Sequence, residues 1–245
     1  MNTPTPATLF AALDATWPAH GITEHAGWLL RDGAGGGKRV SAASPLESGA
    51  DIGEAEVWMQ GQGTRALFRL TPADTALDAA LALRGYALLD PTILYAAPVA
   101  ALAEKPPSVS LFDIWPPLAI MREIWAAGGI TAPRLAVMAR ASTPMTGLIA
   151  RRNDRAAGVA FCALHQGVAM LHAVEVAPAM RHRGVGRLIL RGAAYWAQQQ
   201  GGEWLALAVT EANTGARALY EGAGMVPVTR YHYREKHDDA AGNTA

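Results

Sequence analysis

The sequence has little of what marks secreted, metal-binding or membrane proteins. Cysteine occurs once, at Cys162, so neither an internal disulfide nor a cysteine cluster with metal-ligand spacing can form. No apolar run reaches the roughly 18 residues that a membrane span needs, and residues 1–8 lack the charged start of a signal peptide. We therefore expect no metal, no membrane association and a cytoplasmic location.

The sequence also lacks an excess of charge of either sign. Lysine and arginine together number 21, as do aspartate and glutamate, so no net field favours nucleic acid or an anionic surface as a partner. At 245 residues the chain is long enough for one large or two small domains. The basic residues between positions 181 and 191 are therefore a local feature that needs its own explanation.

Residues 171–196 have the pattern of a strand, a tight turn and a helix. Residues 171–176 alternate and are rich in branched side chains, and Pro178 ends the strand. The turn that follows reads Arg-His-Arg-Gly-Val-Gly over residues 181–186. A helical spacing of apolar residues then begins, at Val185, Leu188, Ile189, Ala193 and Trp196.

This turn is predicted to bind an anion. Its two glycines allow a tight turn that exposes backbone N–H groups which the first helical turn cannot satisfy. Arg181, Arg183 and Arg187 add charge to the positive end of the helix dipole, so the natural ligand is a phosphate or pyrophosphate. A nucleoside triphosphate loop is excluded because no Lys-Ser or Lys-Thr follows, and a dinucleotide loop because residues 188–191 lack a third glycine.

Two motifs make the chain similar to the GNAT superfamily of N-acetyltransferases. Arg-x-x-Gly-x-Gly, at Arg181, Gly184 and Gly186, resembles the superfamily's acetyl-coenzyme A loop. The superfamily's Asn-x-x-Ala-x-x-Leu-Tyr-x-x-x-Gly-Phe segment has a counterpart at residues 213–225, with methionine in place of the final phenylalanine. The resemblance covers residues from about 110 to 236. It implies an α+β fold with a mixed α/β sheet, and acetyl-coenzyme A as cosubstrate.

The resemblance also assigns residues to the cosubstrate. In the superfamily, the strand that matches Val174 to Val176 pairs with the pantetheine arm, and the loop holds the pyrophosphate. The residues expected at the cosubstrate are Val174, Val176, Arg181, His182, Arg183, Gly184, Val185, Gly186, Arg187 and Asn213. Asn213 has an alternative role, because an asparagine at this position can cap the following helix without contacting a ligand.

The general acid is expected from the second motif. Direct transfer of an acetyl group to an amine needs a polarised carbonyl, a deprotonated amine and a protonated leaving thiolate, but no enzyme nucleophile. By resemblance, Tyr220 is the acid that protonates the sulfur. The alternative is a tyrosine that only packs beside Leu219.

The general base is not assigned by the motifs. Ribosomal-protein alanine acetyltransferases, which this half resembles in layout, carry a glutamate where this chain has Ala208. His172 and Glu175 are the main candidates, and strand alternation places them on opposite faces. The segment around His172 resembles the histidine-bearing strand of serotonin-type arylalkylamine acetyltransferases, which implies a base acting through water. Glu211 and a water chain without a single base stay open.

Residues 1–103 repeat the second half weakly. An offset of 139 residues aligns Asp74 with Asn213, and the order of elements agrees, which predicts two GNAT-like halves in tandem. The first half has acidic residues after Pro45 in place of the arginine-glycine loop, so we expect it to be degenerate and non-catalytic. The expected domains are 1–103, a proline-containing linker at 104–109, a catalytic domain at 110–236 and a tail without fixed structure at 237–245.

Periodicity and turn residues predict the elements along the chain. Helices are expected over residues 8–16, 51–60, 74–84, 117–127, 133–141 and 214–221, and from residue 185. Strands are expected over residues 27–31, 39–43, 65–70, 91–96, 109–114, 147–152, 157–164, 168–176, 204–209 and 229–235.

Together these observations predict an N-acetyltransferase that acts on a primary amine of a small molecule or peptide in a ternary complex. Two alternatives remain open. One is an acyl-coenzyme A sensor without turnover, motivated by Ala208, and the other is a transferase of a longer acyl group. A homodimer is also left open. The acceptor is not identified, because tryptophans are more often core than pocket residues; those concerned are Trp28, Trp58, Trp115 and Trp125.

Overall fold

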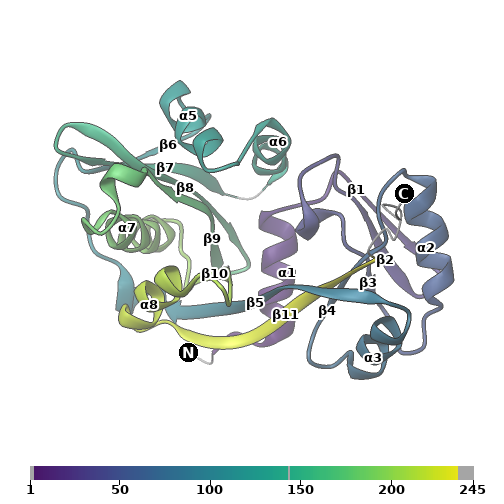
Figure 1. Ribbon diagram of the computed structural model, residues 1–245. Coiled ribbons are helices and arrows are strands. Elements are labelled where there is room, and N and C mark those ends of the chain that lie inside the picture. Colours follow the sequence, from purple (N-terminus) through teal and green to yellow (C-terminus); the bar gives the residue numbers. More distant parts are fainter. Residues whose placement is uncertain (1–2, 143, 237–245) are drawn as a thin grey trace. The chain divides into compact units, whose positions relative to one another are not determined.

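The computed structural model describes residues 3–142 and 144–236, so the predicted tail at 237–245 lies outside the described residues. The described residues form two compact units (Figure 1). The first unit combines the described part of Met1–Pro18 with Ile93–Thr229, and the second combines Ala19–Thr92 with the described part of Arg230–Ala245. Strands β5 and β11 each begin in one unit and end in the other.

The first unit is built on a mixed sheet. Its elements are α1 (Pro6–Thr16), the end of β5 (Tyr86–Pro98), α4 (Val99–Leu102), β6 (Leu111–Ile114), α5 (Ala119–Ala127), α6 (Ala132–Arg140), β7 (Met145–Arg152), β8 (Arg155–His165), β9 (Val168–Val176), η2 (Pro178–Met180), α7 (Val185–Gln199), β10 (Trp204–Thr210), α8 (Thr214–Gly222) and the start of β11 (Val226–Lys236). β9 pairs with β10 in parallel, whereas β9, β8, β7 and β6 pair in antiparallel succession.

The two faces of this sheet carry different helices, because side chains alternate along each strand. Cys162 and Leu171 join the buried face of α7 in one apolar core. Phe161 and His172 lie on the other face, where Trp17 at the end of α1 contacts both rings. Both α1 and α5 contact β8 and β9, and Figure 1 shows α5 and α6 on the side of these strands opposite to α7.

The second unit has a small three-stranded sheet and a second group of hydrogen-bonded strands. Its elements are β1 (Gly21–His25), β2 (Trp28–Asp32), η1 (Lys38–Val40), β3 (Ser44–Pro45), α2 (Ile52–Gly61), β4 (Leu67–Leu70), α3 (Thr75–Leu83), the start of β5 and the end of β11. β1, β2 and β3 are antiparallel neighbours, and β4 pairs antiparallel with β11. The buried rings of Trp28, Phe68 and Tyr86 form the centre of its core.

Most predicted elements are confirmed, with boundary shifts of one to three residues at most ends. The strand predicted at 39–43 was wrong, because this stretch forms the 3-10 turn η1 before the two-residue strand β3. β1 and the one-turn helix α4 were missed, and β5 begins at Tyr86, five residues before the predicted start. In the described parts of the chain, no helix is long and apolar enough to cross a membrane.

The compact units do not follow the predicted boundary at 104–109. Glu104 forms an ion pair with Arg191 of α7, and both residues lie in the first unit. Helix α1 also belongs to the first unit, although it precedes the predicted boundary. A shift of 139 residues brings α3 onto α8 with identical bounds, in keeping with the repeat, while the tandem arrangement itself stays a prediction.

Candidate functional site

A β-bulge in β9 sets which side chains share a face at the centre of the first unit. In the pairing of β9 with β8, His172 lies opposite Phe161 and Glu175 lies opposite Val159. Three steps along β9 therefore match two steps along β8, so β9 carries one extra residue between these pairs. Phe161 and Val159 share a face, and His172 and Glu175 consequently share it too. The prediction of opposite faces was wrong, because simple alternation does not count the extra residue.

Helix α5 contacts the bulge directly. Ala173 has a φ of 49°, and its carbonyl oxygen accepts a 2.8 Å hydrogen bond from Nε1 of Trp125. Trp125 is fully buried, so this contact fixes the backbone at the bulge. Beyond it, Val174 and Val176 pack against the core around α7. The bulge thus directs these two valines and the two base candidates to opposite faces.

β9 and β10 stop pairing before either strand ends. Residues 168–171 pair with residues 204–207, but β9 continues to Val176 and β10 to Thr210. Within the described residues, the part of β9 after the bulge therefore has no ladder with β10. Such an edge offers backbone N–H and C=O groups to an extended ligand, in the manner of strand addition.

The turn after β9 presents the start of α7. Gly184 is the N-cap residue and has a φ of 80°, a left-handed conformation that favours glycine. The first helical hydrogen bond runs from the Leu188 N–H to the Gly184 carbonyl over 3.0 Å, so the N–H groups of residues 185–187 point out of the helix end. Among the described residues, no side chain caps them. This end of the helix can bind a phosphate.

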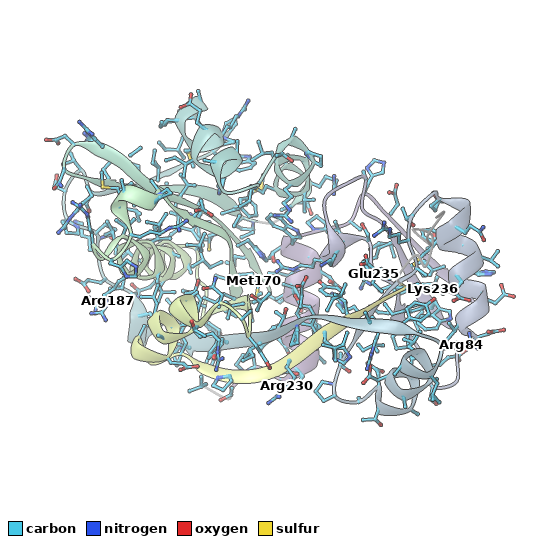
Figure 2. The ribbon with its side chains drawn as sticks, in the orientation of Figure 1. Arg84, Met170, Arg187, Arg230, Glu235 and Lys236 are labelled. Carbon is cyan, nitrogen blue, oxygen red and sulfur yellow. The ribbon has the colours of Figure 1, made fainter. Side chains whose placement is uncertain are left out.

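The surroundings of this helix end are positive and closely packed. Arg183 and Arg187 are exposed, and Arg187 lies in the first turn of α7 (Figure 2). A Cβ on Gly186 would come within 2.9 Å of Cδ2 of Leu219 on α8. Gly186 therefore permits a close approach of α8 to this turn, while Gly184 permits the turn itself.

Arg181, predicted to hold phosphate, is tied to β9 instead of standing free. Its Nε donates to the carbonyl of Val176 over 3.2 Å, and its Nη2 donates to Oε1 of Glu175 over 3.3 Å. The Glu175 side chain is 19% exposed and that of Arg181 55%. A predicted base and a predicted phosphate ligand are thus paired with each other.

Helix α8 carries the second motif. Oδ1 of Asn213 accepts a 3.1 Å hydrogen bond from the Ala216 N–H, so Asn213 is the N-cap of α8. Tyr220 is buried in the same core that Val174 and Val176 contact. Burial raises the pKa of the Tyr220 hydroxyl to about 12. No hydrogen bond joins this hydroxyl to another residue in 3–142 or 144–236, so it is available to a ligand atom.

His172 is enclosed by residues that the motifs do not indicate. Only 3% of the residue is exposed, and its Nε2 lies 2.8 Å from Oγ1 of Thr16. Its ring centroid is 5.1 Å from that of Trp17 and 6.2 Å from that of Phe161. Thr16 is 156 residues away in the sequence, and no spacing rule connects such positions.

The tryptophans considered for an acceptor pocket differ in burial. Trp28 and Trp125 are fully buried, as expected of core residues. Trp115 is partly exposed, and its ring centroid lies 5.3 Å from that of Phe161. An aromatic group made of Trp115, Phe161 and Trp17 therefore lies on the face that His172 and Glu175 share.

The turn, the open strand edge and the mixed sheet are those of an acyltransferase that uses acetyl-coenzyme A. The model of the acetyltransferase (GNAT) family matches residues 115–225, and over this segment the chain is similar to that family. The matched segment contains both sequence motifs. Among residues 3–142 and 144–236, no group of three or more histidine, cysteine, aspartate or glutamate side chains could hold a metal ion.

Relatives resemble nearly the whole chain. An uncharacterized N-acetyltransferase of Bacillus subtilis (strain 168), YobR, is 26% identical over 91% of this chain and 95% of its own length. A GCN5-related N-acetyltransferase from Kribbella flavida has a TM-score of 0.67 at 17% identity, covering 98% of this chain and 99% of that chain. A functionally unknown conserved protein from Staphylococcus epidermidis has a TM-score of 0.69 at 13% identity, covering 92% and 97%. The structural likenesses show the fold.

Proposed function

We propose that this protein transfers the acetyl group of acetyl-coenzyme A to a primary amine of a small molecule or peptide. The observation that carries the proposal is the last part of β9, which in the described part of the chain pairs with β8 but has no ladder with β10 and leads into the turn before α7. An extended thiol ester with a pyrophosphate needs both features in this order. The residues present fit such a group, because the backbone offers amide partners along β9 and N–H groups at the helix end.

Different residues of the chain would hold different parts of the cosubstrate. The N–H groups of residues 185–187 and the guanidinium of Arg187 would hold the pyrophosphate. Val174 and Val176 would pair with the pantetheine amides through their backbone, which is directed by the bulge. A backbone N–H of this stretch would polarise the thioester carbonyl.

The chemistry proceeds by direct attack in the ternary complex. The amine nitrogen bonds to the carbonyl carbon, the C–S bond breaks, and the sulfur takes a proton from the Tyr220 hydroxyl. With a pKa of about 12, this hydroxyl stays protonated at neutral pH until the thiolate departs. The amine proton goes to a base on the face that His172 and Glu175 share. Glu175 is held in its ion pair with Arg181, which favours His172.

A second candidate function is an acyl-coenzyme A sensor without turnover. It is favoured by two observations: Ala208 stands where some relatives in the superfamily carry a carboxylate base, and Glu175 is engaged by Arg181. The sensor and the enzyme share the binding site and differ in turnover. Replacement of the Tyr220 hydroxyl separates them, because only the enzyme needs the acid.

The experiment that tests binding is calorimetric titration with acetyl-coenzyme A, coenzyme A and a longer acyl-coenzyme A. Gly184→Glu places a carboxylate at the helix end and forces a non-glycine residue into a left-handed conformation, so binding should be lost. Arg84→Ala, which removes an exposed arginine of the second unit (Figure 2), is the matched control. Absence of binding by the unmodified protein would overturn the proposal. The ranking of acyl lengths decides between acetyl and longer donors.

A further inference from the structure

The last residue of β9 turns its backbone groups away from β8. The Ala177 N–H donates a 3.0 Å hydrogen bond to the Ala157 carbonyl. In the same register, Val176 lies opposite Gly158. Hydrogen-bonded and non-hydrogen-bonded pairs alternate along antiparallel strands. The N–H and C=O groups of Val176 therefore point to the other edge of β9, where this part of the strand has no ladder with β10 among the described residues.

Arg181 bonds to the carbonyl that this arrangement turns outward. The turn η2 brings the chain back, so that Nε of Arg181 donates to the Val176 carbonyl over 3.2 Å. The same guanidinium donates from Nη2 to Oε1 of Glu175 over 3.3 Å. One planar side chain thus holds a backbone group and a side chain of two successive residues. It ties the turn before α7 to the outer edge of β9.

The end of α5 leaves room for the Glu175 carboxylate. Gly128 is the C-cap residue of α5 and has a φ of −88°, a negative value that other residues also adopt. A Cβ on Gly128 would nevertheless lie 2.5 Å from Cδ of Glu175. The carboxylate therefore lies against the backbone of Gly128 on one hand and bonds to Arg181 on the other. Both contacts limit its movement.

We propose that Arg181 and Glu175 are positioning residues that clamp the end of β9 for the pantetheine arm of acetyl-coenzyme A. The inference rests on the proposed function, and it gives Arg181 a role other than phosphate ligand and Glu175 a role other than base. A strand end that is held extended before the cosubstrate arrives lowers the cost of ordering it on binding. Loss of the clamp should therefore weaken binding of the arm and leave binding of the phosphates unchanged.

The first test is calorimetric titration of the full chain with two probes. Acetyl-coenzyme A has the arm, whereas 3′-phosphoadenosine 5′-diphosphate keeps the pyrophosphate but has no arm. In Arg181→Met the Kd for acetyl-coenzyme A should rise about fivefold, the effect of a lost charged contact at a partly exposed site, while the Kd for the nucleotide stays within about twofold. Arg191→Met, which removes the exposed ion pair of α7 with Glu104, is the matched control.

Substitutions at Glu175 separate the clamp from the two other roles. In Glu175→Ala the Kd for acetyl-coenzyme A should rise about threefold, and Glu175→Gln, which keeps an oxygen for Arg181, should raise it less. If Arg181 were a phosphate ligand, its release in Glu175→Ala would lower this Kd. If Glu175 were only a base, the Kd would not change. The double variant Arg181→Met/Glu175→Ala should bind no more weakly than Arg181→Met, because both changes remove one clamp.

Gly128→Ala tests the position of the carboxylate without altering a charge. Its Cβ displaces the Glu175 side chain, so the Kd for acetyl-coenzyme A should rise as in Glu175→Ala. Gly222→Ala is the control, because Gly222 ends α8 and has open space where its Cβ would lie.

Hydrogen exchange tests the clamp without any ligand. The Ala177 N–H should exchange about fivefold faster in Arg181→Met than in the unmodified protein, and its rate should not change in Arg191→Met. An equal rise in Kd for both probes, a lower or unchanged Kd in Glu175→Ala, or an unchanged exchange rate in Arg181→Met would overturn the clamp alone. If the unmodified protein does not bind acetyl-coenzyme A, the proposed function fails, and the role of the clamp in binding fails with it.

Discussion

Removal of the Tyr220 hydroxyl tests the proposed chemistry most directly. Tyr220→Phe retains the buried ring and its contact with the Tyr95 ring, 6.4 Å away between centroids. The hydroxyl has no hydrogen-bond partner in the described parts of the chain, so the free energy of unfolding should change by less than about 0.5 kcal/mol. A general acid contributes about 10²- to 10⁴-fold to a rate, so kcat should fall by that factor, about 2.7 to 5.4 kcal/mol in the activation barrier.

The pH profile provides a second part of the same prediction. An acid must be protonated to act, and the Tyr220 hydroxyl, with its pKa raised by burial to about 12, is protonated at neutral and mildly alkaline pH. Loss of kcat through deprotonation of Tyr220 is therefore expected only as the pH approaches 12. An alkaline fall in kcat centred near neutral pH would have to come from another group.

The assay is steady-state thiol release from acetyl-coenzyme A with an amine identified from a panel. Binding of acetyl-coenzyme A to Tyr220→Phe should remain within about threefold of the unmodified protein, because the hydroxyl is needed after binding. Tyr195→Phe removes a partly buried tyrosine hydroxyl of α7 and is the control. A kcat within twofold of the unmodified protein would refute the acid role. Unaltered binding with no turnover in any form would favour the sensor.

Three further predictions concern stability and the bulge. Asn213→Ala removes the cap of α8 and should cost about 1 kcal/mol, or about 2–4 °C in Tm; Asn213→Ser, which keeps a capping oxygen, should cost less. Hydrogen bonding from Arg234 lowers the pKa of Asp78, so this carboxylate stabilises the fold at neutral pH. Its contribution disappears as the pH falls through the folded-state pKa. In urea unfolding, the free energy of unfolding should therefore fall less between neutral and acid pH in Asp78→Asn than in the unmodified protein. Trp125→Phe removes the 2.8 Å hydrogen bond to Ala173 and should cost about 1 kcal/mol of stability while raising KM for acetyl-coenzyme A, whereas an unchanged KM would separate the bulge from cosubstrate binding.

The turn after β9 could be predicted from the sequence because its geometry is local. Gly184 and Gly186 lie three and five residues after Arg181. Few turn conformations can connect a strand to a helix over so short a segment. The left-handed φ of Gly184 and the helix beginning at Val185 confirm this local prediction. The same reasoning placed β9 with the bounds that the structure has.

The prediction that side chains alternate regularly along β9 was wrong at the point where its pairing with β8 changes register. His172 and Glu175 share a face only because β8 lacks a partner for one residue of β9. That mismatch is a property of two strands and their neighbour α5, which bonds the bulge through Trp125. A single strand's sequence does not contain it.

The sequence by itself determined the similarity to the GNAT family, the turn after β9 and the cap of α8, because each depends on residues close together in one motif. Tertiary structure alone decided the partners of the base candidates. Arg181 bonds to Glu175, and Thr16 reaches His172 from 156 residues away. Contacts of this kind follow from how α1 and the turn after β9 pack on the sheet. Local propensities and motif spacing do not encode that packing.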